Sequence, residues 1–145
     1  MSTLGQINRV KHAFNSELLT IVINALVFSK LLYCSSVWSS ISGKNIKKLQ
    51  YIQNFAARII SGHRKYDHVT PILKELQWIP VKEQLYYRDA VMAFKCMNGM
   101  VPEYLSSQFT TKETVSGRIT RQSGQLNIPL FTSTIGQKNF SVSYN

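Results

Sequence analysis

The stretch that decides the fold is KNIKKLQYIQNFAARIISG, residues 44–62. Its apolar side chains recur every three or four residues, which is the spacing of one buried face of an α-helix. Gly62 follows the pattern, and glycine commonly ends a helix because it adopts the left-handed conformation without strain. The stretch therefore predicts a helix from Lys44 to Ser61. Its predicted core positions are Ile46, Leu49, Ile52, Ala56, Ile59 and Ile60.

The opposite side of this predicted helix is basic and contains one aromatic ring. Its residues are Lys44, Lys47, Tyr51, Asn54 and Arg58. Basic side chains can follow the phosphates of a nucleic acid, and a tyrosine can stack on a base. From this helix alone, a solvated helix face is the simpler interpretation, and both interpretations stay open.

Upstream, a second helix is predicted from Glu17 to Tyr33, capped by Asn15-Ser16. It is apolar on nearly all sides, which is typical of a helix buried in the centre of a bundle. Between Glu17 and Lys30 lie 12 uncharged residues, whereas a membrane span needs about 20. No membrane association is expected. Residues 1–15 are polar and mixed and predict no element.

Downstream, Thr70 as cap and Pro71 as first helical residue predict a short helix to Gln77. A longer helix is predicted from Pro80 to about Asn98-Gly99. Two apolar arcs on this helix predict packing between neighbours on two sides. The first arc is Val81, Leu85, Met92 and Cys96, and the second is Tyr87, Ala90, Val91 and Phe94.

The composition of the chain changes after Phe109. A further short helix is expected from Pro102 to Ser107, and residues 110–125 read as a mobile basic loop with Arg118 and Arg121. Short extended segments are expected between Leu126 and Tyr144. The predicted fold is mainly α, a small bundle of about four to five helices with an irregular tail. The predicted domains are residues 1–109 and a basic loop and tail at 110–145.

Charge is concentrated at the start of the chain. The 17 Lys and Arg against 7 Asp and Glu give a net charge of +10, and residues 1–66 contain nine basic side chains and one acidic. Such an excess indicates a polyanionic partner. Cys34 and Cys96 have no metal-ligand spacing, so we expect reduced core residues in an intracellular compartment, nucleus or cytoplasm.

The residue pattern predicts no catalytic or metal site. Polymerase chemistry requires neighbouring carboxylates that hold two metal ions, yet the two aspartates, Asp67 and Asp89, lie on different predicted elements. Cys34 and the serines after it have no histidine nearby in sequence to act as a base. His63, Asp67 and His68 resemble metal ligands. The stronger interpretation is a turn in which Asp67 or His68 accepts hydrogen bonds from backbone N–H groups ahead of Thr70. No cofactor is expected.

Several stretches together resemble one family. Residues 67–81 (DHVTPILKELQWIPV), 94–99 (FKCMNG) and 102–105 (PEYL) are similar to the C-terminal region of non-LTR (LINE-type) retrotransposon reverse transcriptases. The same family is resembled, in the same order, by residues 23–38, 49–50, 53–60, 118–121 and 136–142.

This resemblance implies a thumb and the segment after it, a helical element that grips the template–primer duplex. It also implies that fingers, palm and any endonuclease domain are missing, and that both ends are truncated, since the family commonly continues after the Phe-Ser segment. The chain would then be a fragment of an RNA-directed DNA polymerase without catalytic residues of its own. Its expected partners are an RNA–DNA hybrid or RNA, contacted along the backbone, and the missing palm and fingers.

Nine residues are the candidate nucleic-acid contacts, with Arg88 and Lys95 as a second, weaker stripe. They are Lys44, Lys47, Lys48, Tyr51, Arg58, Arg64, Lys65, Arg88 and Lys95. The alternative function is a non-catalytic helical interaction or structural module derived from such an element. A free-standing enzyme is the weakest hypothesis.

Overall fold

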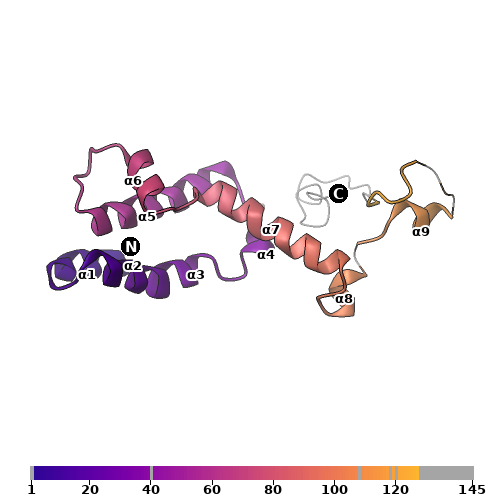
Figure 1. Ribbon diagram of the computed structural model, residues 1–145, viewed down its shortest axis with the longest axis horizontal. Helices are drawn as coiled ribbons and strands as arrows, with labels where there is room; N and C mark the ends of the chain where they lie inside the picture. The colour runs from indigo at the N-terminus through magenta and orange to yellow at the C-terminus, as the bar shows by residue number, and fades with distance from the viewer. Residues whose placement is uncertain (1, 40, 108, 118, 120, 128–145) are drawn as a thin grey trace. The chain divides into compact units, whose positions relative to one another are not determined.

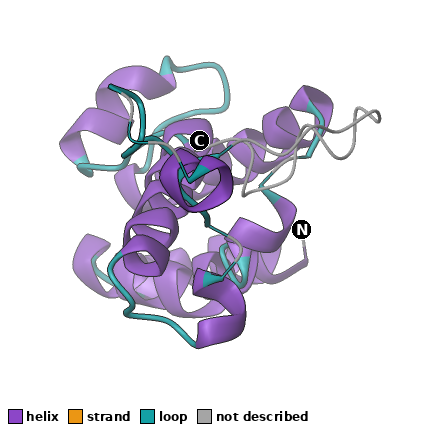
Figure 2. Cartoon of the chain, turned by 90° about the vertical axis from the view of Figure 1, so that its right-hand side faces the viewer, coloured by secondary structure: helices purple, strands orange, loops and turns teal. Residues whose placement is uncertain are grey.

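The computed structural model describes residues 2–39, 41–107, 109–117, 119 and 121–127, and these are mainly helical (Figures 1 and 2). The predicted fold class is confirmed, and the extended segments predicted beyond residue 127 lie outside the described residues. The α-helices are α1 Ser2–Val10, α2 Ser16–Ile23, α3 Ser29–Leu31, α4 Ser35–Trp38, α5 Gly43–Ser61, α6 Val69–Glu75, α7 Val81–Met97, α8 Glu103–Ser106 and α9 Lys112–Ser116. A 3₁₀ turn, η1 Lys11–Ala13, follows α1, and a π-helical turn, η2 Asn24–Phe28, joins α2 to α3.

The described residues fall into two compact units. One lies within residues 1–35 and 41–85, and the other within residues 36–40 and 86–145. The first unit contains α1, α2, α3, α5 and α6, and it holds most of the buried apolar side chains. The predicted start of a basic tail after residue 109 stays a prediction.

Helix α5 is the centre of the first unit and confirms the prediction for residues 44–61. It contacts α6 on one side and α1 and α2 on another (Figure 1). Gly62 ends it with φ of 70°, a left-handed conformation that other residues adopt only with strain. Ala56, Ala57, Ile59 and Ile60 are all buried.

Helix α6 packs on α5 through a small apolar cluster. Ala57 of α5 meets Ile72 and Leu73 of α6, and three partly buried side chains, Val69, Leu76 and Trp78, surround them. The Trp78 ring also meets the Phe28 ring edge-to-face, with centroids 4.9 Å apart. Trp78 thus connects the end of α6 to the π-helical turn of the first unit.

The connection from α6 to α7 is held by two glutamines of α5. Gln53, only 3% exposed, donates from Nε2 to the Ile79 carbonyl at 2.9 Å. Gln50 accepts a 2.9 Å hydrogen bond at Oε1 from the backbone N–H of Val81, the first residue of α7. Gln50 also donates to Gln53 and to Asn54, each at 2.8 Å. These amides satisfy backbone groups that the Ile79–Val81 connection leaves without partners in a helix.

The helix predicted from Glu17 to Tyr33 forms a helical segment from Ser16 to Leu31, and the prediction that it is buried on nearly all sides is wrong. Its start is as expected, because the Asn15 side chain accepts from the Leu18 N–H at 2.8 Å. Leu19, Ile23, Phe28 and Leu32 form the buried side, whereas Ile21 is 62% exposed. Leu18 and Leu26 are exposed as well. Within the first unit the segment packs against α5 through α2 and against α1 through η2, and the side that carries Ile21 remains exposed.

Four smaller expectations are also wrong. Residues 2–10 form α1, which buries Leu4 and Ile7. Residues 110–125 are more than a loop, because Thr111 caps α9 and pairs with Leu126 in an isolated antiparallel bridge. Cys34 is exposed. Helix α6 begins at Val69, so Thr70 lies inside it and does not cap it.

Helix α7 confirms the predicted bounds, but one of its two predicted core arcs is wrong. Gly99 ends the helix with φ of 66°, and the Met100 N–H donates to the Lys95 carbonyl at 2.9 Å. Val81, Leu85, Asp89, Ala93 and Cys96 are buried, and burial raises the pKa of the Cys96 thiol. Tyr87, Ala90 and Phe94 of the second arc are exposed. Helix α7 is therefore covered on one side.

Candidate nucleic-acid interface

The first half of α5 presents a basic row to solvent. Lys44, Lys47 and Lys48 are exposed, and Tyr51, 67% exposed, continues the row by one turn. Residues three and four apart are neighbours on a helix surface, so these four side chains are adjacent. The opposite side of this half is half-buried at Ile46 and Leu49 and buried at Gln53, so the row points away from the packed side of the helix. No acidic residue occurs between Leu18 and Tyr66.

Arg58 lies on the same helix but has a structural role. It is half-buried, and its guanidinium donates to the Asp67 carbonyl at 3.0 Å. Its Nε is buried without a hydrogen-bond partner. Arg58 thus ties the turn after Gly62 back onto α5, and its remaining donors are less accessible to a ligand than those of the lysine row.

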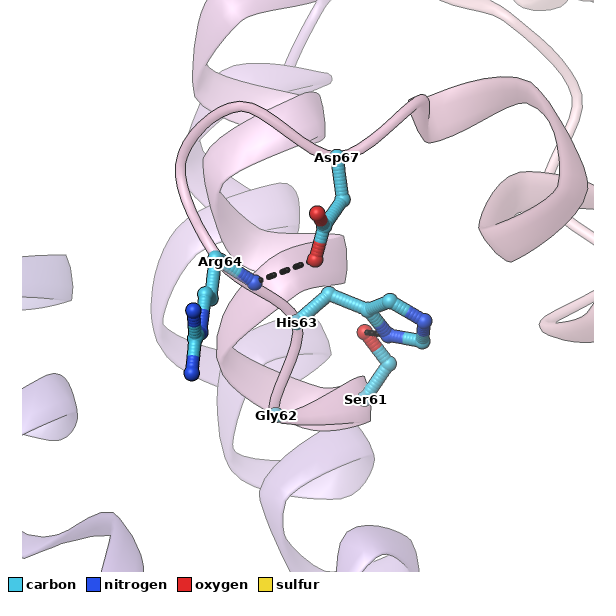
Figure 3. Close-up of a pocket in the computed structure, with 5 residues that line it drawn as sticks. All are labelled: Ser61, Gly62, His63, Arg64 and Asp67. Atoms are coloured by element: carbon cyan, nitrogen blue, oxygen red, sulfur yellow. Dashed lines mark hydrogen bonds between the residues drawn. The ribbon is translucent and has the colours of Figure 1, made fainter.

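The turn after α5 is organised by Asp67 (Figure 3). The Asp67 carboxylate accepts from the Arg64 backbone N–H at 2.7 Å, while the Arg64 side chain points away from it. His63 Nδ1 lies 2.9 Å from the Ser61 hydroxyl. The prediction that Asp67 binds a backbone N–H ahead of Thr70 is confirmed, and His68 makes no such cap. Among the described residues, no group of three or more His, Cys, Asp or Glu side chains could hold a metal ion.

Arg64 and Lys65 are exposed in this turn, beyond the end of α5. The Lys65 ammonium lies over the Tyr66 ring, 5.8 Å from its centroid, a cation–π contact. Arg64 and Lys65 therefore extend the positive charge of α5 past its C-terminal end, separated from the lysine row by Arg58.

Arg88 and Lys95 belong to the second unit. Both are exposed and lie seven residues apart on α7, close to one line along the helix. Arg88 additionally makes an interaction within the chain. The structure thus brings the α5 residues together in the first unit and gives the second unit a basic stripe of its own.

The roles of two sets of residues were not predicted from the sequence. Gln50 and Gln53 support the start of α7, and their amide side chains carry no pattern that would indicate this. Tyr87 and Phe94 are exposed beside the second basic stripe. Their position next to Arg88 and Lys95 on the helical wheel was the available signal, but an apolar arc is equally typical of a core face.

The chain was compared with protein-family models, with curated proteins and with solved structures, and none of them matches it. No helix of the described residues is both long and apolar enough to cross a bilayer.

Proposed function

We propose that the chain grips nucleic acid through the basic row of α5, as the thumb and following segment of a non-LTR retrotransposon reverse transcriptase without the polymerase active site. The observation that carries the proposal is the exposed row Lys44, Lys47, Lys48 and Tyr51 on a helix whose other side is buried. The sequence resemblance supplies the polymerase context.

The electrostatics of α5 favour an anionic ligand. The positive end of the helix dipole lies at Gly43, where acidic side chains are normally found. Here the first turn has no acidic residue, and Ser42 makes no side-chain cap hydrogen bond. Three lysines within the first six residues add positive charge to this end. A phosphate chain would neutralise both the lysines and the helix end.

The spacing of the row suits backbone contacts. Lys44 and Tyr51 are seven residues apart, which is about 10 Å along a helix. That length matches about three stacked nucleotides of one strand. Contacts to phosphates carry no sequence information, as a protein that copies any template requires. Tyr51 adds one stacking surface at the end of the row.

The proposal predicts strongly salt-dependent binding to a short RNA–DNA hybrid. If the row makes three phosphate contacts, raising the salt concentration from 50 to 200 mM should weaken the affinity about 40-fold. Lys47→Glu should reduce the slope of log K against log salt by about 0.9, because one contact is lost. Fluorescence anisotropy titrations at several salt concentrations measure both quantities.

Lys74→Glu is the matched control, because Lys74 is an exposed lysine of α6 in the same unit. It changes the net charge equally but lies outside the row. Binding that does not depend on salt, or an equal loss of slope in both variants, would contradict the proposal.

One observation favours the alternative, a helical interaction module. Leu18, Ile21 and Leu26 are exposed on the side of α2 and η2 that no described helix covers. Self-association through this surface predicts an oligomer that Ile21→Glu dissociates. Light scattering measures the mass in solution. A stable oligomer that binds no hybrid would support the module and contradict the polymerase assignment, and a monomer would rule out this surface as a self-association site.

A further inference from the structure

The exposed side of α7 combines aromatic rings with positive charge in a repeating arrangement. Tyr87 is 65% exposed and Phe94 is 59% exposed. The residue after each of them is basic, Arg88 and Lys95 respectively. The second pair follows the first after seven residues, which is about two helical turns. Each pair therefore offers an aromatic ring and, beside it, a cation.

The rings lie on the side of α7 opposite to its buried residues, and they therefore point outward. Asp89, Ala93 and Cys96 are buried, and they lie on the side of the helix opposite to Tyr87 and Phe94. The one acidic residue of this part of α7, Asp89, therefore faces inward. Glu83, one turn before Tyr87, is the nearest exposed acid on the same helix and marks the end of the positively charged surface.

We propose that this surface binds single-stranded nucleic acid, with unpaired bases stacked on Tyr87 and Phe94 and the phosphates running along Arg88 and Lys95. The inference rests on the proposed function and extends it from gripping a duplex to holding an unpaired strand. The rings lie about 10 Å apart along the helix, the length of about three stacked nucleotides. A strand of four or five nucleotides can reach both.

Charge decides between a nucleic acid and a protein as the occupant. An apolar helix face alone would suit either. Here a basic residue lies beside each ring, which matches a ligand in which every nucleotide carries a base to stack and a backbone phosphate to pair with a cation. Aromatic platforms with basic side chains are the common arrangement for binding single strands without sequence preference. Tyrosine and phenylalanine also lose little conformational entropy when they become contacts.

The test uses the full chain and two probes of equal charge: a 12-nucleotide oligothymidylate and an abasic strand of the same length. Tyr87→Ala and Phe94→Ala should each weaken binding of oligothymidylate about five- to 150-fold, because one base loses its stacking partner. The affinity for the abasic strand should change by less than about twofold. Tyr87→Trp should retain binding, since it preserves the platform.

Two further variants act as controls. Phe14→Ala removes an exposed phenylalanine of the first unit and should alter neither affinity. Lys95→Gln should weaken the binding of both probes to the same extent, because it removes a phosphate contact but no ring. Circular dichroism checks that every variant keeps the helical content of the unchanged chain.

The outcomes separate this proposal from the function of α5. Lys47→Glu should weaken binding of the RNA–DNA hybrid, whereas Tyr87→Ala and Phe94→Ala should leave the affinity for the hybrid unchanged. Oligothymidylate binding lost in the ring variants would support the α7 site even if the hybrid did not bind. Equal affinity for both probes, unchanged in the ring variants, would overturn it. Self-association lost in the ring variants, with strand binding unchanged, would identify a protein-docking face and overturn it too.

Discussion

Phe28→Ala is expected to lower the free energy of unfolding by about 3–5 kcal/mol, since it removes a buried aromatic side chain and leaves a cavity. The Phe28 ring is buried and meets the Trp78 ring at an interplanar angle of 90°. The loss is a large fraction of the ~5–15 kcal/mol that typically stabilises a domain. Urea denaturation followed by circular dichroism measures it.

Phe14→Ala is the matched comparison, because Phe14 is exposed in the same unit. Exposed substitutions usually change stability by less than about 0.5 kcal/mol. A double-mutant cycle with Trp78→Ala should give a coupling of about 0.5–1.5 kcal/mol for the ring pair. If Phe28→Ala were no more destabilising than Phe14→Ala, the Phe28–Trp78 contact would not be part of the core.

Ile72→Ala should cost about 2–5 kcal/mol, the range for truncating a buried isoleucine. Ile72 lies on α6, is 2% exposed and packs against Ala57 of α5. The neighbouring Ala57 has only a short methyl side chain without alternative rotamers, so it cannot fill the space and the cavity should persist. The milder Ile72→Val should cost about 0.5–1.5 kcal/mol. Thermal and urea unfolding give both values.

Ile79→Ala is the control for Ile72, because Ile79 is exposed only a few residues further along the chain. Hydrogen exchange adds a local readout, since amides of α6 should lose protection first when α6 detaches from α5. Equal stability of the Ile72→Ala and Ile79→Ala variants would show that α6 does not pack on α5 as described.

The sequence predicted the long helices because their signals are local. Helix α5 has an apolar period and a terminal glycine, and α7 has a proline before it and a glycine after it. Helix α1 was missed because only two residues, Leu4 and Ile7, form its buried side in an otherwise polar segment. Its stability comes from packing against α5 and η2, which periodicity does not report.

Coverage of a helix face is the property that the sequence could not supply. In the sequence, the buried and the exposed apolar sides of the Ser16–Leu31 segment and of α7 have the same pattern. Whether a side is buried depends on which other element packs against it. The same reason applies to the candidate site. The lysine row of α5 follows from spacing, whereas the role of Arg58 depends on a turn that folds back nine residues later.

The π-helical turn Asn24–Phe28 has a consequence for the length of the chain. The buried residues Leu19, Ile23, Phe28 and Leu32 are spaced four, five and four residues apart, and the Ser29 N–H donates to the Asn24 carbonyl, five residues back. Deletion of one residue here would restore regular four-residue spacing, with the same side chains still on the buried side. Related chains can therefore differ by one residue at this turn and share one core, and an alignment of them should place its gap there.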